Sequence, residues 1–576
     1  MSVEEFNKMP HFICEYIAKY AKERPEDIAI IDADDGKWVT WEIFNQTIDM
    51  YALELLEMGY QKGDIIITQM PLILEHTYLM HACYKLGIII CPLDVRLRER
   101  EVVRCTQLLK EKARMFVAPD DTDSEDKLGR KKFYPFKQHA RALREQCPFI
   151  KDYIQLSPIE DADKGTIGVL NWLKAIREKW LHFSKKSDLH KKALFKLNEA
   201  YSKVKEDDPI LIIYTTGSTG FPKPSLLTNV GIVAQNYCMA KGFKITIKDR
   251  MLVNLPPSHV GCVTEQLATT IFAGAISVII HGFKADKSLK AIQDYKVTIF
   301  GQIPSLFELE WRLKDYNSYD LSSLRFAIYG GQAVSRKFLE QLSTMAPQIG
   351  SGLGLTEMSG FCSYTLPDAK VEDILDNLGH DYPLSPLSIR KPMNPDGTAG
   401  EELPPNEVGE ICYTGPQVFA GYFGNEKATR ETISEEGVLY TGDMGFKDEK
   451  RNLHMAGRRK FIIKPKGFQV YPPEIEAFIE HLPEVALAGV IGAKHEVFSE
   501  GIVAFIELKH GKKLTVEKLR KHCEELAMYK RPSLYIFLDE IPLNRVDKTD
   551  YQYLYKIVDK YINQQREKGG WDSPRE

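Results

Sequence analysis

The first hundred residues alternate between stretches with apolar residues at helical spacing and shorter, nearly continuous apolar runs. We predict helices at 12–23, 42–58 and 76–86. Gly59 and Gly87 follow the second and third of these stretches and mark their ends. We predict strands at 28–32, 37–40, 64–69 and 88–90, the first two forming a hairpin. Strands and helices that alternate at this spacing predict a layered α/β architecture.

Further β-branched runs predict additional strands of a parallel sheet. They lie at 210–213, 251–255, 275–280, 297–300 and 326–329. The last run ends in Gly330-Gly331, and a helix is predicted from Ser335 onward. A glycine pair lets the backbone approach a ligand closely, and the carboxyl edge of a parallel sheet is where α/β proteins bind ligands.

The run Tyr214-Thr-Thr-Gly-Ser-Thr-Gly-Phe-Pro-Lys-Pro224 follows the strand predicted at 210–213. Its glycines would let the backbone approach an anion, its hydroxyls would donate to phosphate oxygens, and its lysine would balance the charge. The order of the common P-loop, G-x-x-x-x-G-K-[ST], is missing. Taken alone, the run is also typical of a flexible polar turn after a strand. The candidate phosphate cradle consists of Thr215, Thr216, Gly217, Ser218, Thr219, Gly220 and Lys223.

With 576 residues the chain is too long for one core, so we expect at least two domains. A formal net charge of −4 gives no reason to expect nucleic acid or an anionic membrane as the main partner. The ten cysteines lack C-x-x-C spacing and indicate neither a zinc site nor a disulfide framework. The start does not resemble a secretory signal, and the most apolar segment, 267–280, is too short to span a bilayer. We therefore expect a soluble, cytoplasmic protein without a transmembrane segment.

Residues 171–205 are unusually basic, with ten Lys/Arg against three Asp/Glu. Apolar residues recur between the lysines at helical spacing, which predicts two amphipathic helices. The basic residues are then either a solvated outer face or a docking surface for an acidic partner, such as a carrier protein, a membrane surface or a nucleotide phosphate. The sequence leaves both interpretations open.

The character of the sequence changes around Gly457. Arg458-Arg-Lys460 is followed by the apolar Phe461-Ile-Ile463 and by Lys464-Pro-Lys-Gly467. The remaining residues are typical of a small α+β domain. We therefore predict a large, multi-layer α/β domain with parallel-rich sheets at 1–458 and a small α+β domain at 459–576.

Further short motifs stand before and after the candidate phosphate cradle. They are Lys85-Leu-Gly-Ile-Ile-Ile-Cys-Pro-Leu-Asp94, Pro256-Pro-Ser-His-Val-Gly261, Gly330-Gly-Gln332, Gly352-Leu-Gly-Leu-Thr-Glu357, Gly409-Glu-Ile411, Gly421-Tyr422, Tyr440-Thr-Gly-Asp443, Gly457-Arg-Arg-Lys460, Lys464-Pro-Lys-Gly467, Pro473-Glu-Ile-Glu476 and Pro542 with Lys548. In this order, over about 39–553, they resemble the adenylate-forming superfamily of acyl-CoA synthetases, peptide-synthetase adenylation domains and firefly luciferase. The similarity is greatest to the AMP-forming acyl-CoA ligases.

The resemblance implies a two-step reaction. A carboxylate is a poor electrophile, so ATP converts it to an acyl adenylate with release of pyrophosphate. A thiol, here that of CoA, then displaces AMP. Two anions meet in the first step, which requires positive groups and oriented amides around the developing charge. The resemblance thus implies ATP, Mg²⁺ and CoA. For the acid we predict a chain of about six to ten carbons or a cyclic or aromatic ring, because an apolar pocket discriminates weakly between acids that differ by one methylene.

The resemblance also assigns a role to each matching residue. Lys548 would bridge the carboxylate and the α-phosphate, Asp443 would bind the ribose hydroxyls with support from Arg458, and Glu357 would hold Mg²⁺. His259 would close the carboxylate pocket, which Gly331 and Gly354 also line. Gly331, Gln332, Gly352, Leu353 and Thr356 would complete the nucleotide site. A small mobile domain would turn at Lys460 and bring Lys466 and Gly467 to CoA.

Some positions depart from the family pattern. Leu353 stands where many relatives have an aromatic side chain that stacks on adenine, and Asp547 stands where a glycine usually precedes the catalytic lysine. Pro224 and Phe461 are also unusual. Two alternatives therefore stay open beside the CoA ligase: an adenylating enzyme that loads a separate carrier protein, and a nucleotide-binding relative without catalysis.

Overall fold

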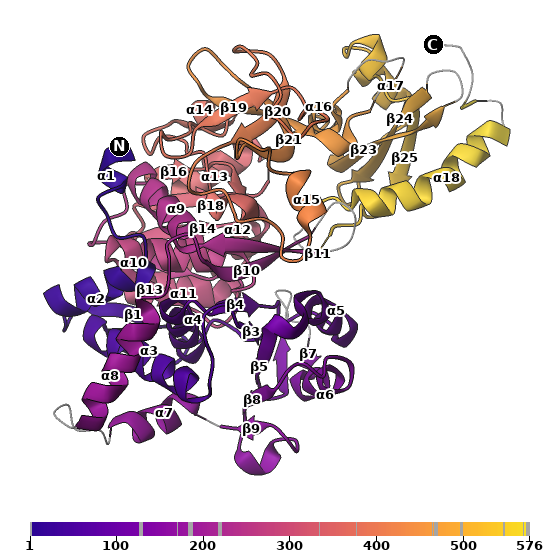
Figure 1. Cartoon of the computed structure of the whole chain (residues 1–576). Helices are drawn as coiled ribbons and strands as arrows, with labels where there is room; N and C mark the ends of the chain where they lie inside the picture. Colours follow the sequence, from indigo (N-terminus) through magenta and orange to yellow (C-terminus); the bar gives the residue numbers. More distant parts are fainter. Residues whose placement is uncertain are drawn as a thin grey trace. The chain divides into compact units, whose positions relative to one another are not determined.

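The computed structural model describes residues 3–125, 131–169, 171–181, 188–216, 222–332, 334–375, 377–463, 465, 470–495, 499–544, 548–567 and 570–571. The chain forms two compact units (Figure 1). The first comprises 1–387 and 413–439, and the second comprises 388–412 and 440–576. The second unit thus includes residues 388–412 and 440–458, which precede the predicted start of the small domain at Arg459. The domain boundary at Arg458 and the hinge at Lys460 stay predictions.

The first unit contains a seven-stranded sheet that is parallel except at one edge. Its order is β16 (Gln348–Gly350), β15 (Phe326–Tyr329), β14 (Ile299–Gln302), β12 (Arg250–Val253), β13 (Ile276–Ile279), β1 (Ile28–Asp32) and β2 (Lys37–Thr40). β1 and β2 pair antiparallel, which confirms the predicted hairpin. The strands predicted from the later apolar runs all lie in this sheet, apart from the one that begins near Ile210.

A second seven-stranded sheet in the same unit carries the candidate phosphate cradle. Its order is β11 (Pro222–Thr228), β10 (Pro209–Thr216), β4 (Ile89–Pro92), β3 (Ile65–Thr68), β5 (Ala113–Pro119), β8 (Asp152–Leu156) and β9 (Ile167–Gly168). Only the edge strand β11 is antiparallel to its neighbour. The isoleucine-rich strands β3 and β4 are fully buried, as expected for parallel strands covered on both faces.

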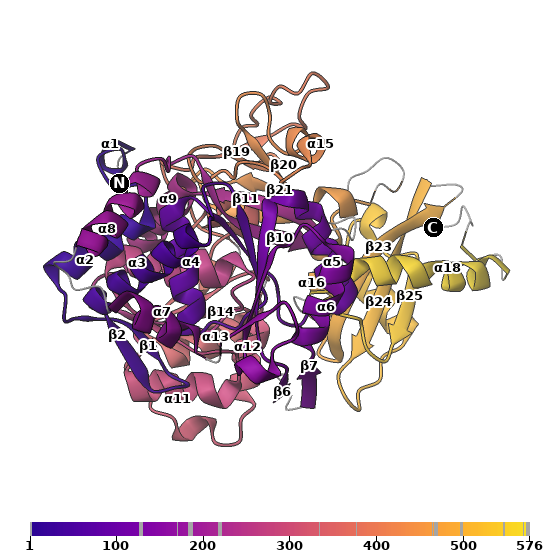
Figure 2. The same ribbon diagram turned by 60° about the horizontal axis from the view of Figure 1, so that its bottom comes forward.

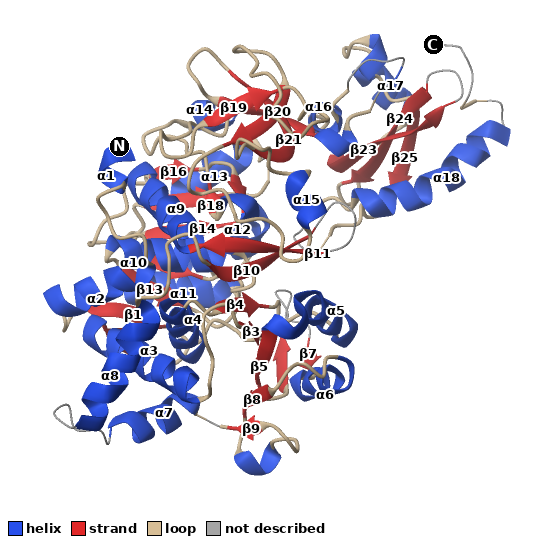
Figure 3. Cartoon of the chain, in the orientation of Figure 1, coloured by secondary structure: helices blue, strands red, loops and turns tan. Residues whose placement is uncertain are grey.

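Helices form three layers around these sheets (Figure 3). α2 (Ile13–Glu23), α3 (Trp41–Glu57), α4 (Leu74–Leu86), α9 (Asn229–Gly242) and α10 (Thr269–Ala273) pack together between the sheets, since α3 contacts β1 and α4 contacts β4. α11 (Ala285–Tyr295), α12 (Pro304–Trp311) and α13 (Arg336–Met345) cover the outer face of the first sheet. α5 (Glu99–Leu109) and α6 (Phe136–Gln146) cover that of the second. The predicted multi-layer α/β class is confirmed.

Local sequence signals set several helix ends. Gly87 adopts φ 66° at the end of α4, a left-handed conformation that glycine adopts without strain. The Ser335 side chain accepts a hydrogen bond from Phe338 N and caps α13. The first unit also contains α1 (Val3–Phe6), α14 (Val371–Leu375), α15 (Glu426–Arg430), the pair β6 (Thr122–Glu125) and β7 (Lys131–Tyr134), and the pair β17 (Gly354–Leu355) and β18 (Gly360–Phe361).

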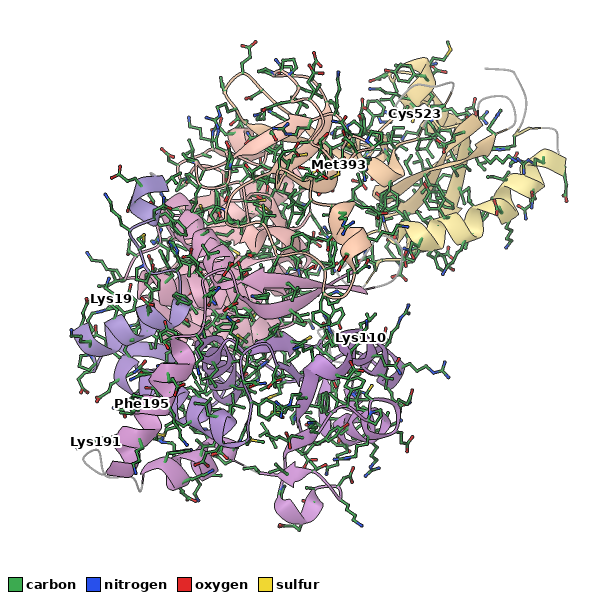
Figure 4. The ribbon with its side chains drawn as sticks, viewed as in Figure 1. Lys19, Lys110, Lys191, Phe195, Met393 and Cys523 are labelled. Atoms are coloured by element: carbon green, nitrogen blue, oxygen red, sulfur yellow. The ribbon has the colours of Figure 1, made fainter. Side chains whose placement is uncertain are left out.

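The basic segment forms α7 (Trp172–Leu181) and α8 (Asp188–Tyr201). Trp172, Ile176 and Leu197 are buried, and both helices contact α3, as predicted for amphipathic helices. Phe195 is 70% exposed and lies with Lys191 on α8 (Figure 4). Lys185 and Lys186 lie outside the described residues. Whether this surface docks an acidic partner stays open.

The second unit contains two sheets. The first has the order β19 (Leu387–Arg390), β20 (Gly409–Tyr413), β21 (Leu439–Lys447) and β22 (Leu453–Arg458), and the second has β23 (Val485–His495), β24 (Ser499–Leu508) and β25 (Leu534–Leu538). α16 (Pro472–Glu480) and α17 (Val516–Cys523) pack on one face of the second sheet, and α18 (Tyr551–Glu567) packs on the other (Figure 2). This arrangement confirms a small α+β region at the C-terminal end.

Each helix within the described ranges is too short or too polar to span a bilayer.

Candidate active site

The candidate phosphate cradle is the end of the β10–β11 hairpin. Thr215 lies opposite Lys223 in the strand pairing, so the predicted hydroxyl and ammonium groups come from adjacent strands. The Thr215 hydroxyl donates to the Lys223 carbonyl oxygen at 3.4 Å. Gly217, Ser218, Thr219 and Gly220 lie outside the described residues, and so does the side chain of Thr216. The run is therefore the end of a hairpin of the second sheet.

Tyr422 links the cradle to the predicted magnesium ligand. The Lys223 ammonium nitrogen lies 4.7 Å from the centre of the Tyr422 ring, and the Tyr422 hydroxyl donates to Glu357 Oε1 at 2.7 Å. Burial and the neighbouring Glu357 raise the pKa of Tyr422 well above its usual value, so this hydroxyl keeps its proton. Glu357 is a partly exposed carboxylate, the hard oxygen donor that Mg²⁺ prefers. The residue set therefore fits the predicted metal.

Backbone pairing holds these three residues together. The segment before Tyr422 pairs with β11, since Leu226 N donates to Gly421 O and Ala420 N donates to Leu226 O, both at 2.9 Å. Phe419 N donates to Glu357 O at 2.9 Å. Tyr422 was part of a predicted motif but had no predicted role. The signal in the sequence was Gly421-Tyr422, which does not indicate what the ring contacts.

The turn at 352–357 depends on close backbone contact. A Cβ added to Gly352 would lie 1.9 Å from the Ser363 carbonyl oxygen, so only glycine fits there. Leu353 is 8% exposed, and its N–H donates to the Ser363 hydroxyl at 2.9 Å. Little of the Leu353 side chain is thus available to an adenine ring. Thr356 is partly exposed, next to Glu357 in a 3₁₀ turn, 356–358.

The residues predicted to line the acid site lie on three segments of the first unit. His259 is exposed, and its Nδ1 accepts the N–H of Gly261 at 2.9 Å, directly before the π-helix Gly261–Ala268. Gly331 adopts φ 88° after β15, with Gln332 next to it, and Gly354 is exposed in β17.

Sequence reasoning missed Glu265, which lies on the same π-helix. Its Oε1 would be 3.1 Å from a Cβ added to Gly354, and its Oε2 would be 3.6 Å from one added to Gly261. Its carboxyl group therefore lies beside two of the segments that carry the predicted acid-site residues. No motif contains Glu265, so the sequence offered no signal beyond a single acidic residue in an apolar stretch.

In the second unit, the predicted ribose carboxylate and its supporting arginine are directly paired. Asp443 of β21 lies opposite Arg458 of β22, and Arg458 Nε is 2.7 Å from Asp443 Oδ1. Asp443 is 2% exposed as a residue, whereas half of the Arg458 side chain is exposed. Such a charge-assisted hydrogen bond fixes the carboxylate and leaves the guanidinium edge accessible.

Lys548 belongs to the same cluster. Its ammonium group is partly desolvated and feels the Arg458 charge, which together lower its pKa, while Asp443 acts in the opposite direction. Lys548 itself retains exposed surface, as a reactive side chain must. The backbones of Asn544 and Lys548 are joined by a 2.7 Å hydrogen bond. Asp547, which departs from the family pattern, lies outside the described residues.

Glu410 organises the residues on either side of this cluster. It is 1% exposed, its Oε1 accepts the N–H of Gly442 at 2.9 Å, and its Oε2 lies 2.8 Å from Arg459 Nη1. It therefore connects the turn that precedes Asp443 to the residue that follows Arg458. Glu410 belongs to the motif Gly409-Glu-Ile411 but had no predicted role, because a buried glutamate and a surface glutamate look alike in a sequence.

The predicted hinge residue follows directly. Lys460 lies 4.2 Å above the ring of Phe461, and desolvation together with the Arg458 charge lowers its pKa to about 8. Phe461 packs on Tyr551 with ring centres 4.5 Å apart, and the Tyr551 hydroxyl donates to Glu476. This contact gives the unusual Phe461 a packing role. Lys466 and Gly467, the predicted CoA-binding residues, lie outside the described residues.

Comparisons with known proteins identify the family of the chain. The chain matches the models for "AMP-binding enzyme" at 17–423 and "AMP-binding enzyme C-terminal domain" at 474–548. It is 28% identical to a 4-coumarate--CoA ligase of Humulus lupulus, covering 93% of this chain and 92% of the relative. It is 27% identical to a putative acyl-CoA synthetase of Bacillus subtilis, covering 93% and 95%.

A solved structure with the same fold is ATP-bound MatB from Rhodopseudomonas palustris. It superposes with a TM-score of 0.76 at 21% identity, covering 95% of this chain and 99% of MatB. At 21% sequence identity, the similarity to MatB shows a shared fold and no more. The family models and the relatives together establish more: the chain belongs to the AMP-binding enzyme family, the adenylate-forming superfamily predicted from its motifs, and is an AMP-forming CoA ligase.

Proposed function

We propose that the protein activates a medium-chain or cyclic or aromatic carboxylic acid as its CoA thioester. The acid and ATP give an acyl adenylate and pyrophosphate, and the CoA thiol then displaces AMP. An aromatic acid is consistent with a 28% identical relative that is named as a 4-coumarate ligase. Because a thioester and ATP lie close in free energy, we expect the reaction to be reversible until pyrophosphate is removed.

The observation that carries the proposal is the cluster of Asp443, Arg458 and Lys548. One buried carboxylate, one guanidinium and one lysine with a lowered pKa lie together in the second unit. We propose that Asp443 accepts hydrogen bonds from the ribose hydroxyls. Lys548 then contacts the acid carboxylate and the α-phosphate, where positive charge stabilises the transition state of adenylation.

The first unit supplies groups suited to the rest of the nucleotide and to the acid. We propose that the hairpin end with Thr215 and Lys223 binds the β- and γ-phosphates, and that Glu357 is the ligand of Mg²⁺. The ion would neutralise phosphate charge. Gly331 and Gln332, together with Gly352 and Thr356, would contact the adenine side. His259, with Gly331 and Gly354, would bind the acid.

The thioester step is proposed for the C-terminal region. The family resemblance suggests that the small domain turns at Lys460 and brings Lys466 and Gly467 to CoA in exchange for Lys548. CoA is preferred over a carrier protein because Lys464-Pro-Lys-Gly-Phe-Gln469 resembles the corresponding segment of CoA ligases, and two relatives are named as a CoA ligase and an acyl-CoA synthetase. A carrier-loading enzyme would instead stop at the adenylate, and a non-catalytic relative would bind ATP without releasing pyrophosphate.

The test is release of pyrophosphate and AMP from ATP and Mg²⁺ across a panel of acids, with and without CoA. Wild type is compared with Lys548→Ala and with Lys556→Ala, a matched control on an exposed position of α18. We expect acid-dependent release that rises with CoA, falls at least about a hundredfold in Lys548→Ala and is unchanged in Lys556→Ala. Bound ATP without release for any acid would refute the proposal.

A further inference from the structure

Glu265 occupies an unusual position for an acidic side chain. It lies on the π-helix Gly261–Ala268, and its carboxyl group sits against the short β17–β18 pair. A Cβ added to Gly360, which adopts φ 132°, would lie 2.7 Å from Glu265 Cγ. Any larger residue at position 360 would therefore displace the Glu265 side chain. The close contact between Glu265 and the 360 backbone depends on the glycine.

The carboxyl group of Glu265 lies between two segments that carry predicted acid-site residues. A Cβ added to Gly261 would lie 3.0 Å from His259 Nδ1 and 3.6 Å from Glu265 Oε2. The space left by the missing side chain at Gly261 thus separates the imidazole from the carboxyl group. The other carboxyl oxygen, Glu265 Oε1, lies on the side of the exposed Gly354. A Cβ added to Gly354 would be 3.1 Å from it.

The hydrogen bonding of Glu265 within the protein is sparse. It accepts the backbone N–H of Phe361. Among the described residues, no lysine, arginine or histidine forms an ion pair with it. Desolvation raises its pKa to about 8. A carboxyl group in such surroundings is favoured by any additional polar partner, because its remaining hydrogen-bonding capacity is unused.

Three other desolvated glutamates have side-chain partners, whereas Glu480, like Glu265, accepts a hydrogen bond from a backbone N–H, that of Ala488. Glu310 accepts from Gln302 Nε2 at 2.8 Å, Glu410 pairs with Arg459, and Glu476 accepts from the Tyr551 hydroxyl. Glu265 retains some exposed surface, and its carboxyl group lies between the segments that carry His259 and Gly354, so a ligand bound there can supply a further hydrogen bond.

We propose that Glu265 determines substrate specificity by hydrogen bonding to a donor on the acyl group, and that the substrate is a hydroxy- or amino-substituted carboxylic acid. This inference rests on the proposed function, because it assumes that His259, Gly331 and Gly354 border the acid. A hydroxyl donates to the carboxyl oxygen, and an amine binds it as an ammonium–carboxylate pair. An unsubstituted acid offers no donor to the remaining hydrogen-bonding capacity of the carboxyl group and is rejected on that account.

The test uses matched acids that differ by one group: an arylpropenoic acid, its ring-hydroxylated form and its ring-aminomethylated form. kcat/KM for pyrophosphate release is measured for wild type, Glu265→Gln, Glu265→Leu and the control Glu340→Leu, an exposed position on α13. We expect wild type and the control to prefer a substituted acid at least about tenfold. Glu265→Leu should lose the preference. Glu265→Gln should keep it for the hydroxyl and lose it for the amine.

A second measurement separates this inference from the proposed function. Non-hydrolysable acyl-sulfamoyl adenosines of the same acids bind without turnover, so their affinities report the acyl contact alone. If wild type binds the analogues of substituted acids more tightly and Glu265→Leu does not, the inference is supported. If in addition no acid is activated, the proposed ligase function fails while the inference stands. Equal acid preference in wild type and Glu265→Leu, in turnover and in binding, overturns the inference, and so does failure of every analogue to bind.

Discussion

Arg458 Nε lies 2.7 Å from Asp443 Oδ1, and the two residues face each other across the β21–β22 pairing. The carboxylate is thus held by the neighbouring strand before any ligand binds. Because the Arg458 side chain is half exposed while Asp443 is buried, the pair costs less desolvation than a fully buried pair would. The arginine orients the acid that we assign to the ribose.

Loss of the arginine that orients the Asp443 carboxylate should reduce the catalytic efficiency with ATP and leave that with the acid largely unchanged. We expect Arg458→Leu to lower kcat/KM for ATP by about ten- to hundredfold while the KM for the acid changes little, because a misplaced carboxylate loses the ribose. Steady-state kinetics with each substrate varied in turn would measure this. Arg430→Leu, which alters an exposed arginine of α15, is the control. Equal loss toward ATP and the acid would argue against an orienting role.

The hydrogen bond from Tyr422 to Glu357 predicts an effect on the metal requirement. In Tyr422→Phe the Glu357 carboxylate loses its 2.7 Å donor and with it a fixed orientation. We expect the Mg²⁺ concentration for half-maximal activity to rise roughly tenfold, as is usual when a residue that orients a metal ligand is removed. Tyr295→Phe provides a matched control in the same unit. An unchanged Mg²⁺ dependence would exclude Glu357 as the magnesium ligand or Tyr422 as its support.

Glu476 predicts a pH dependence of stability. Burial raises its pKa from 4.5 to about 7, so the folded state retains a proton that the unfolded chain has lost. Its contribution is complete below about pH 4.5 and is lost as the pH rises to about 7. Glu476→Gln should therefore flatten the stability curve across this window and stabilise the protein at pH 8, by at most about 3 kcal/mol.

Thermal unfolding of wild type and Glu476→Gln from pH 4 to pH 8 would test this. The neighbouring Glu480 also has a raised pKa, because burial outweighs its hydrogen bond from Ala488 N, so some slope should remain in the variant. Glu474→Gln, an exposed position on the same helix, should leave the slope unchanged. Parallel curves for wild type and Glu476→Gln would show that Glu476 titrates normally in the folded protein.

The contact at Gly352 predicts a large loss of stability. Gly352→Ala would place a methyl group 1.9 Å from the Ser363 carbonyl oxygen, and two backbone segments would have to separate. We expect destabilisation of more than about 3 kcal/mol, or loss of soluble protein. At Gly282 an added Cβ meets nothing within 4 Å, so Gly282→Ala should be close to neutral. Denaturant unfolding would compare them, and similar midpoints would contradict the assigned contact.

The short motifs made much of the fold and site readable from the sequence. Gly87 and Ser335 marked helix ends correctly because capping depends on local chemistry. Asp443, Arg458 and Lys548 were recognised separately, but their proximity depends on the β21–β22 pairing and on a distant turn. Sequence spacing does not report such contacts.

Other features were not predictable for the same reason. Leu353 is 8% exposed, and this burial depends on packing against segments that are distant in the sequence. Glu265 and Glu410 gave no sign of their desolvation, because the residues that surround them come from distant segments. The sequence shows which residue stands at each position. It does not show whether that residue is desolvated, because desolvation arises only after folding.

All ten cysteines are buried and free, and Figure 4 labels one of them, Cys523 on α17. For the folded protein this means a very low background of reaction with maleimide dyes. One new cysteine in each unit, for example at the exposed positions Lys427 and Lys512, would carry a fluorophore pair without removal of any native thiol. Energy transfer between the dyes could then follow the predicted rotation at Lys460 during a single turnover.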